Sequence, residues 1–297
     1  MSRRTLIVDG ALDVAATLRT SAAKAVGRIV LHGGDTWWVQ RTPTGPVSMR
    51  IGGGGGQFEA EAFGPGSGWA LEHLPDLLGV DDDPSWFRPP PGPLRDLHGA
   101  ALGMRLGRSG LVFGALLAAI LAQRVTAEEA HGAYREIVRS YGEPAPGPLR
   151  AMVPPGPTDI AALGYQDLHR FGVERGRAMT LIEAARRIGR LEAVTRMEHG
   201  DGYRRLQAVR GIGPWTAAIV MGAACGDPDA VPVADYHLPS LVAWALAGEP
   251  RATDERMLEL LEPYRGHRRR VIFLLERSGI RPPGYGPRIA RRRIAAS

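Results

Sequence analysis

The stretch from Arg88 to Pro93 divides the chain into two parts with different sequence patterns. It holds four prolines and one glycine, which favour a stiff, non-helical linker. Before it, short runs rich in β-branched and aromatic residues alternate with glycine-rich turns, a pattern typical of strands. After it, apolar residues recur at helical spacing through most of the chain. We therefore predict an α+β fold, with an N-terminal α/β domain over residues 1–88 and a mostly helical domain over residues 94–297.

The first part is predicted to hold five strands and two helices. Gly52–Gly56 has spacings typical of a phosphate-binding loop, but no helix opens after it, so we predict a hairpin turn there. The expected strands are Thr5–Val8, Gly27–Leu31, Thr36–Arg41, Val47–Ile51 and Phe58–Phe63, and the expected helices are Leu12–Arg19 and Trp69–Leu78.

The second part is predicted to be helical, with a Pro/Gly-rich loop over Tyr141–Pro157. Thr126 and Glu129 form a capping-box pattern that starts one helix. The other expected helices are Val112–Gln123, Thr158–Leu163, Tyr165–Phe171, Glu174–Ile188, Leu191–Arg196, Tyr203–Val209, Pro214–Ala224, Leu238–Ala247, Asp254–Leu261 and Arg268–Ser278.

Composition excludes several kinds of site. Cys225 is the single cysteine, so the chain forms no internal disulfide and no cysteine-ligated zinc or iron–sulfur cluster. The eight histidines include no pair at the spacing of a helical zinc site. No run of 18 apolar residues occurs, and the first residues lack the apolar core of a signal peptide. We therefore expect a cytoplasmic protein.

Positive charge gathers toward the C-terminal end. The chain carries a formal net charge of +6, with 37 basic residues of which Lys24 is the single lysine. Residues 264–297 hold ten arginines against Glu276 alone, whereas residues 57–86 hold seven carboxylates and no basic residue. This asymmetry favours a polyanionic partner that approaches from one side. A solvated surface in a GC-biased proteome explains the same counts.

The segment Leu206–Ala217 predicts two helices joined by a tight hairpin. Gly211 and Gly213 allow positive φ and a close approach of another backbone, and Ile212 between them can anchor the turn in the core. Pro214 suits the first position of the second helix, whose free amides suit a phosphate. On spacing alone, an ordinary helical hairpin without a ligand fits as well.

This segment resembles the helix-hairpin-helix of the DNA glycosylase superfamily, whose members also have a Gly/Pro-rich loop and a distal aspartate. Asp235 matches that aspartate, 22 residues beyond Gly213. Residues 118–126 are similar to the family's helix end and the loop that enters the DNA, and residues 263–265 to its Pro-aromatic-Arg segment. The β-rich first part resembles the bacterial 3-methyladenine DNA glycosylase II subgroup. The resemblance covers the whole chain and is most specific over residues 206–235.

The resemblance implies cleavage of the bond between a base and its deoxyribose. A carboxylate beside the sugar stabilises the oxocarbenium character of the transition state and orients water, and Asp235 is the candidate. Its alternative role as a helix cap is compatible with this one. The nearby Asp201, Asp227 and Asp229 lie among glycines and prolines, where aspartates commonly cap turns.

Strand-nicking members of the superfamily resemble one another in carrying a lysine two residues after the second hairpin glycine, where it forms a Schiff base with the sugar. This chain has Trp215 at that position, and Lys24 is far away in the sequence. The resemblance therefore implies a monofunctional glycosylase that uses water and leaves an abasic site.

The resemblance also assigns a base pocket and a DNA-binding surface. Trp215 and Phe273 match aromatic residues that stack on an extruded base, and Ile219 replaces a family tyrosine; core packing is the other reading of both aromatics. Arg124 stands at the position of the wedge that fills the gap in the duplex. The remaining DNA contacts are expected from Gly211, Ile212, Gly213, Thr216, Val125 and Arg265, with Arg268, Arg269 and Arg270 as further backbone candidates, although three consecutive arginines cannot all face one way. The carbonyls of Gln207, Val209 and Ile212 match positions that hold a monovalent cation.

The expected partner is double-stranded DNA with damaged bases, bound by a monomer that has no required cofactor and no membrane contact. Two alternatives remain open. One is a non-catalytic protein that recognises lesions or DNA structure through the same hairpin, which needs no Asp235. The other is a glycosylase for an oxidised, deaminated or bulky alkylated base, which the departures at Ile219 and Arg124 allow.

Overall fold

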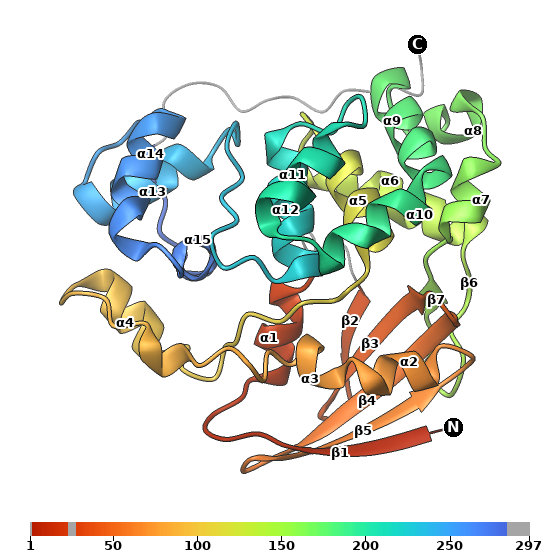
Figure 1. Cartoon of the computed structure of the whole chain (residues 1–297), viewed down its shortest axis with the longest axis horizontal. Helices are drawn as coiled ribbons and strands as arrows, with labels where there is room; N and C mark the ends of the chain where they lie inside the picture. The colour runs from red at the N-terminus through yellow and green to blue at the C-terminus, as the bar shows by residue number, and fades with distance from the viewer. Residues whose placement is uncertain (1, 23–27, 284–297) are drawn as a thin grey trace.

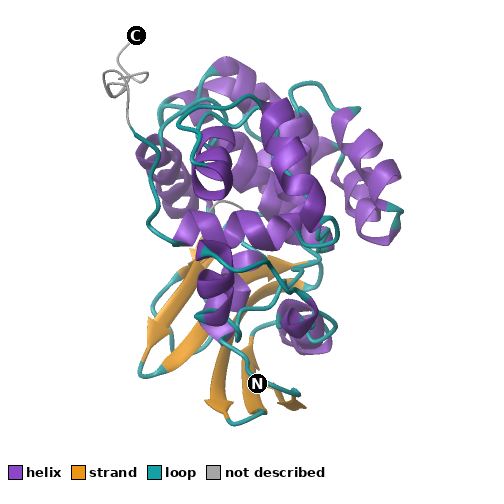
Figure 2. Ribbon diagram, turned by 90° about the vertical axis from the view of Figure 1, so that its left-hand side faces the viewer, coloured by secondary structure: helices purple, strands orange, loops and turns teal. Residues whose placement is uncertain are grey.

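The computed structural model describes residues 2–22 and 28–283, which form a β-sheet and two groups of helices (Figure 1). The sheet lies below the helices in this view, and the same arrangement is visible from the side in Figure 2. The α+β class predicted from the sequence is confirmed. Lys24, the first residue of the predicted strand at 27–31, and four of the ten C-terminal arginines lie outside the described residues.

The sheet is antiparallel and has the strand order β1-β5-β4-β3-β2. The predicted turn at the glycine run is confirmed: Gly54 pairs with Gln57, and Gly55 and Gly56 turn the chain with φ of 62° and 88°. Three short helices contribute leucines and alanines to a core on the sheet. The strands are β1 (Ser2–Ile7), β2 (Arg28–His32), β3 (Asp35–Thr42), β4 (Gly45–Gly54) and β5 (Gln57–Phe63), and the helices are α1 (Val14–Thr20), α2 (Ser67–Glu72) and α3 (Leu74–Leu77).

Two of these helices replace one predicted helix. The sequence predicts a single helix over Trp69–Leu78, but α2 ends at Glu72 and α3 begins at Leu74, with Pro75 in its first turn. Proline lacks an amide hydrogen and clashes with the preceding turn, so it starts a helix more readily than it continues one. Asp13 caps α1 by accepting a hydrogen bond from the amide of Ala16 at 2.8 Å.

The larger helical group surrounds α5 (Val112–Leu121), whose residues are almost all buried. The capping box at α6 (Ala127–Tyr141) is confirmed, because the Thr126 and Glu129 side chains each bind the other residue's amide. The predicted loop over 141–157 contains a two-residue strand pair, β6 (Glu143–Pro144) and β7 (Met152–Val153). The remaining elements are α7 (Pro157–Ala161), α8 (Tyr165–His169), α9 (Arg175–Arg186), α10 (Ile188–Leu191), a 3-10 turn (Glu192–Arg196), α11 (His199–Gln207) and α12 (Pro214–Val220).

A second helical group has its own apolar core. It consists of α4 (Pro93–Gly99), α13 (Leu238–Ala247), α14 (Asp254–Leu261) and α15 (Arg268–Arg277). Helix α4 was not predicted from the sequence; it starts with the last proline of the linker at its first position. Ala16 of α1 and Phe87 also join this core, so it draws on residues from before the linker. The domain boundary at residues 88–94 stays a prediction.

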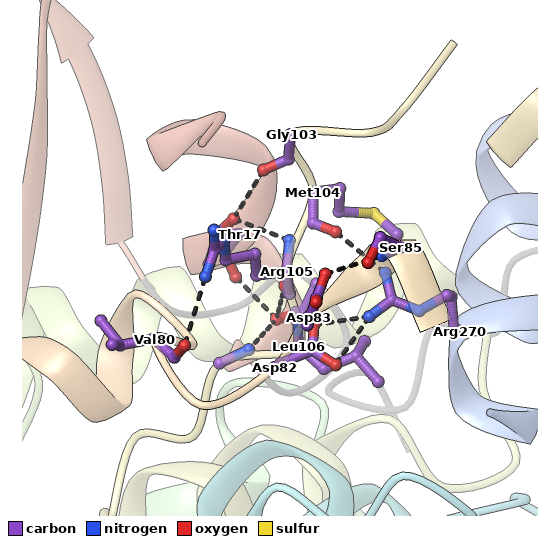
Figure 3. Close-up of polar contacts among 12 residues, drawn as sticks. Thr17, Val80, Asp82, Asp83, Ser85, Gly103, Met104, Arg105, Leu106 and Arg270 are labelled. Carbon is purple, nitrogen blue, oxygen red and sulfur yellow. Dashed lines mark hydrogen bonds and ion pairs between the residues drawn. The ribbon is translucent and has the colours of Figure 1, made fainter. Parts of the chain in front are cut away.

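A buried arginine of α15 contacts residues from distant parts of the chain (Figure 3). Arg270 is 0% exposed, donates to the Met104 carbonyl at 3.0 Å and lies 2.7 Å from Oδ1 of Asp82. Arg269 is 6% exposed. The expectation that Arg270 contacts the DNA backbone is therefore wrong, because its side chain is enclosed by the protein. The expected backbone contact of Arg269, whose side chain is nearly buried, stays a prediction.

The acidic run over residues 57–86 is partly neutralised by arginines from elsewhere in the chain. Besides the pairing of Asp82 with Arg270, Glu61 pairs with two arginines of the sheet and Asp76 with Arg108. These pairs reduce the asymmetry of charge that the sequence indicated. No helix in the described part of the chain is long and apolar enough to cross a membrane.

Candidate active site and nucleic-acid interface

The predicted hairpin joins α11 to α12. Gly211 has φ of 90°, a backbone conformation that residues with side chains rarely adopt. A Cβ at this position would lie 2.0 Å from Oγ1 of Thr180, so glycine is also needed for the close approach of α9. Ile212 is 3% exposed and anchors the turn, and Pro214 is the first residue of α12. The prediction is confirmed for Gly211, Ile212 and Pro214. It is wrong for Gly213, which has φ of −90° and where a Cβ would meet no atom within 4 Å, so neither a positive φ nor a close approach requires glycine there.

Asp235 lies at the end of the loop that leads into α13. Its Oδ1 accepts hydrogen bonds from the amides of His237 at 2.9 Å and Leu238 at 3.1 Å, so the carboxylate caps the helix. Its Oδ2 accepts a hydrogen bond from the indole Nε1 of Trp215 at 2.9 Å. Three N–H donors around one carboxylate hold it in a fixed orientation and suit its ionised form.

The contact between Trp215 and Asp235 was not anticipated from the sequence. The sequence indicates a stacking or core role for Trp215, whereas its half-buried indole also orients the aspartate. The two residues are 20 positions apart in the sequence, in α12 and in the loop before α13. A motif of glycines and prolines does not predict that their side chains meet. The stacking role remains a prediction.

A cleft of about 2240 Å³ brings most of the predicted site residues together. Asp235 lines it together with all three predicted pocket residues, Trp215, Ile219 and Phe273. The residues predicted for DNA and cation contacts that line the same cleft are Gln207, Val209, Gly211, Ile212, Gly213, Thr216, Arg124 and Val125.

Arg265 is one of the predicted DNA-contacting residues that do not line this cleft, together with Arg268 and Arg270. Its side chain is 71% exposed, and its Nε donates to Oε1 of Glu262 at 3.0 Å. Arg268 pairs with the same glutamate. Both arginines therefore share one counter-charge on the surface, and the DNA contact of Arg265 stays a prediction.

The cleft is predominantly basic. Eight arginines line it against five carboxylates. The exposed ones among these arginines are Arg124, Arg175, Arg187, Arg210 and Arg277. A concave surface with an excess of positive charge attracts a polyanion more strongly than a flat one does, because its low-dielectric walls focus the field.

Backbone strain gathers at the same cleft. Within the described residues, Arg124 (φ 54°) and Ala234 (φ 63°) are the non-glycine residues with positive φ, and both line the cleft. Such conformations cost on the order of 1–3 kcal/mol each and cluster at functional sites. Ala234 is held by its amide, which donates to Oδ2 of Asp254 at 2.7 Å. This strained residue immediately precedes Asp235.

Gln123 is a residue of the site that the sequence did not single out. Its Nε2 donates to the carbonyl of Gly211 at 3.0 Å and to Oγ1 of Thr216 at 2.8 Å. Gln123 thereby ties the loop that carries Arg124 to the hairpin. The Thr216 hydroxyl is buried and bound to this glutamine, while the predicted DNA contact of Thr216 remains untested. A polar residue at the end of an apolar helix is the signal that could have identified Gln123.

The family profile described as "HhH-GPD superfamily base excision DNA repair protein" matches residues 117–265, half of the chain. The matched range contains the hairpin, Trp215 and Asp235. The chain belongs to the HhH-GPD superfamily. The resemblance to helix-hairpin-helix glycosylases inferred from the sequence is thereby confirmed.

Two curated proteins are similar to this HhH-GPD protein in sequence. A Bacillus subtilis protein bearing the name DNA-3-methyladenine glycosylase is 28% identical over 160 residues, which cover 52% of this chain and 55% of the relative. A Mycobacterium tuberculosis protein, named as a bifunctional transcriptional activator and DNA repair enzyme, is 30% identical over 171 residues, or 56% of this chain and 32% of the relative. The match thus spans about half of one relative and a third of the other.

Solved structures share the fold of this HhH-GPD protein over nearly its whole length. The 3-methyladenine DNA glycosylase from Archaeoglobus fulgidus has a TM-score of 0.76 at 19% identity, covering 93% of this chain and 98% of that one. The Clostridium acetobutylicum 8-oxoguanine glycosylase/lyase, solved with double-stranded DNA, has a TM-score of 0.69 at 14% identity, covering 90% and 92%. At these identities the likeness establishes the fold alone.

The hairpin carbonyls fit the predicted monovalent cation in their chemistry. Val209 accepts the amide of Ile212 at 3.0 Å, and a carbonyl oxygen with one hydrogen bond retains a second lone pair for a cation. Among the described residues, no group of three or more histidine, cysteine, aspartate or glutamate side chains could hold a metal ion.

Proposed function

We propose that this HhH-GPD protein is a monofunctional DNA glycosylase that extrudes alkylated purines from double-stranded DNA and hydrolyses their N-glycosidic bond, leaving an abasic site. The observation that carries the proposal is the Asp235 carboxylate, which three N–H groups hold at the wall of a basic cleft. The names of the sequence relatives, which refer to 3-methyladenine and DNA repair, support the substrate class.

Asp235 acts on the sugar rather than on the base. As the glycosidic bond lengthens, positive charge develops on the deoxyribose, and an anion fixed beside it stabilises that charge without having to reorganise. Water adds its oxygen to C1′ and gives up one proton to Asp235. The base leaves with the bonding electrons, so a purine made cationic by alkylation departs as a neutral molecule.

The hairpin and its neighbours hold the DNA. The amides at the start of α12 meet a phosphate at the positive end of the helix dipole. Arg124 projects from a strained loop and fills the space that the extruded nucleotide leaves. In the pocket, Trp215 and Phe273 stack on the base, and an aromatic face attracts a cationic alkylated purine. Ile219 makes this pocket less aromatic than one with a tyrosine there.

The absence of a lysine at position 215 argues for hydrolysis without strand nicking. A Schiff base with the sugar needs an amine at the site, and the hairpin places Trp215 there instead. Lys24, the single amine-bearing side chain, lies outside the described residues, so this branch needs a direct test. Incubation with borohydride should trap no covalent protein–DNA complex, and the DNA should remain intact until alkali is added. A trapped complex that Lys24→Arg abolishes would contradict this argument.

The decisive experiment measures base release by wild type and Asp235→Asn. Methylated duplex DNA is incubated with each protein, and free 3-methyladenine and 7-methylguanine are quantified. Asparagine keeps the shape of the side chain and removes its charge, so release should fall at least about 100-fold. Asp201→Asn is the matched control, because Asp201 pairs with Arg204 on the surface of α11 and does not line the cleft.

Two results would refute the proposal. Wild-type rates in Asp235→Asn would remove the aspartate from the mechanism. Salt-sensitive duplex binding by the wild type without release of any base would instead support the non-catalytic alternative. A wider panel of oxidised and deaminated bases then distinguishes the second alternative.

We also propose that the protein acts as a monomer and that a monovalent cation binds the carbonyls of Gln207, Val209 and Ile212. The cation would link the hairpin to a DNA phosphate and takes no part in bond cleavage. Duplex binding at constant ionic strength should be tighter in potassium than in tetramethylammonium, which is too large for such a site. Equal affinity in both salts would argue against the cation.

A further inference from the structure

Two helices line the cleft from different parts of the chain. From α12 come Trp215 and Ile219, followed by Gly222 in the π-helical turn Met221–Cys225 that continues the helix. From α15 comes a face at helical spacing that includes Arg269 and Phe273. Seven residues separate Trp215 from Gly222, about 10 Å along a helix. Because Asp235 is hydrogen-bonded to Trp215, it lies at one end of the wall that α12 forms in the cleft, and Gly222 lies at the other end.

Arg269 lies at the end marked by Gly222. A Cβ at position 222 would be 2.9 Å from Nε of Arg269 and 3.3 Å from Cβ of Ala230. Glycine at this position thus leaves room for the guanidinium against the wall of the cleft. Helices with a π turn are common at functional sites because the wider turn displaces neighbouring side chains.

The Arg269 guanidinium is buried and incompletely bonded. Its side chain donates from Nη2 to the carbonyl of Thr20, but its Nη1 has no hydrogen-bond partner among the described residues. Burial lowers the pKa of Arg269 to about 10, and the nearby Asp227 carboxylate opposes this shift. The group therefore still carries its positive charge at neutral pH. A buried charged donor without a partner is costly, and an acceptor on a ligand would remove that cost.

The neighbouring Arg270 has the opposite surroundings. It is paired with Asp82 and the Met104 carbonyl, and it does not line the cleft. Two consecutive arginines of α15 thus differ in role. Arg270 has a counter-charge within the protein, whereas Arg269 belongs to the wall of the cleft and its buried Nη1 has no partner among the described residues.

We propose that Arg269 is a specificity-determining residue that donates a hydrogen bond to a carbonyl oxygen on the far edge of the extruded purine, so that the site favours bases with a carbonyl at C6. This inference rests on the proposed base excision. A guanidinium is a donor only, so it pairs with the C6 carbonyl of 7-methylguanine or hypoxanthine. The 6-amino group of 3-methyladenine is also a donor there and leaves both groups unsatisfied. A site that offers such a donor favours bases that can accept the hydrogen bond over bases that cannot.

The charge of Arg269 adds an order among the favoured bases. Hypoxanthine is neutral, whereas a 7-methylguanine nucleotide carries a positive charge that the guanidinium opposes. Arg269 should therefore promote hypoxanthine release most, 7-methylguanine release less, and 3-methyladenine release not at all.

The test compares two products from one substrate. Duplex DNA treated with a methylating agent contains both 7-methylguanine and 3-methyladenine, and the ratio of their release rates cancels any loss of folded protein. Arg269→Met should lower this ratio at least tenfold relative to wild type. Arg270→Met, the matched control from the adjacent position, should lower both rates together and leave the ratio unchanged. An unchanged ratio in Arg269→Met would overturn the inference.

A second variant and a second measurement test the inference even if Arg269→Met folds poorly. Gly222→Ala keeps the charge but crowds the guanidinium, and it should lower the same ratio. Binding of free hypoxanthine and free adenine, followed by quenching of tryptophan fluorescence, needs no catalysis. Wild type should bind hypoxanthine at least tenfold more tightly, and Gly222→Ala should lose this preference. Equal binding of the two bases would reject the role of Arg269, even if no base release were found and the proposed function had failed.

Discussion

Replacing Asp82 by asparagine should lower the free energy of unfolding by about 3 kcal/mol. Oδ1 of Asp82 lies 2.7 Å from Nη2 of Arg270, and Oδ2 accepts the amide of Leu106 at 2.7 Å. Arg270 is 0% exposed, so loss of the carboxylate charge leaves a buried cation without its counter-charge. Breaking a buried pair in this way costs about 3–5 kcal/mol.

The structure places the expected cost at the low end of that range. The Asp82 side chain is 22% exposed, so water screens part of the lost attraction. Asparagine also retains one acceptor oxygen, and the Met104 carbonyl still accepts from Arg270 at 3.0 Å. The double variant Asp82→Asn/Arg270→Met also removes the unpaired cation. Its loss of unfolding free energy should therefore be about 2 kcal/mol smaller than the sum of the losses in the two single variants.

Urea unfolding followed by tryptophan fluorescence and by circular dichroism measures these differences. Asp76→Asn is the matched control, because its partner Arg108 is 48% exposed and such surface pairs contribute about 0–1 kcal/mol. The reasoning fails if Asp82→Asn falls within 1 kcal/mol of wild type, or if the losses of the two single variants simply add in the double variant.

Four further results are expected, at three residues. Trp215→Phe keeps an aromatic ring but removes the N–H donor 2.9 Å from Asp235. The kcat for base release should therefore fall about 10- to 100-fold. The Kd for duplex DNA, measured by fluorescence anisotropy, should stay within about threefold of wild type. Ala234→Gly relieves the strain of a φ of 63°. Because this relief exceeds the entropy that glycine costs, the free energy of unfolding in urea titrations should rise by about 0.5–1 kcal/mol. A loss of stability would contradict this. Burial raises the pKa of Cys225 from 9.0 to about 12, so the native thiol should react with maleimide at pH 8 far more slowly than the unfolded one. Because the unfolded thiol ionises first, stability should decline above pH 9, which urea titrations at pH 8 and pH 10 would reveal or exclude.

The parts of the fold that could be predicted from the sequence are those fixed by local chemistry. The positive φ of Gly211, the place of Pro214 in α12 and the capping box at Thr126 each depend on residues within a few positions of one another. A hairpin at Gly55 follows from the same kind of reasoning. The resemblance to a family then located Asp235 at the cleft.

The features that escaped prediction depend on contacts between distant parts of the chain. Arg270 can be buried because Asp82, 188 residues earlier in the sequence, provides a counter-charge. The residues next to Arg270 in the sequence do not predict this pairing. Trp215 orients Asp235 through the fold of the loop between them, and Gln123 reaches the hairpin across 93 positions. A run of three arginines reads as one basic patch, although α15 turns each of its members toward a different environment.

The bond between Arg269 and the Thr20 carbonyl joins residues 249 positions apart. Because a chain is synthesised from its N-terminus, this contact of α1 can form only when nearly the whole chain has been made. The hairpin between α11 and α12 depends on near neighbours and can fold earlier, as local contacts generally do. During that interval, the apolar residues that later line the cleft are open to water and to other unfinished chains. Completion of the cleft therefore depends on α15, and a chain arrested before that helix would carry the hairpin without the residues that α15 contributes to the cleft wall.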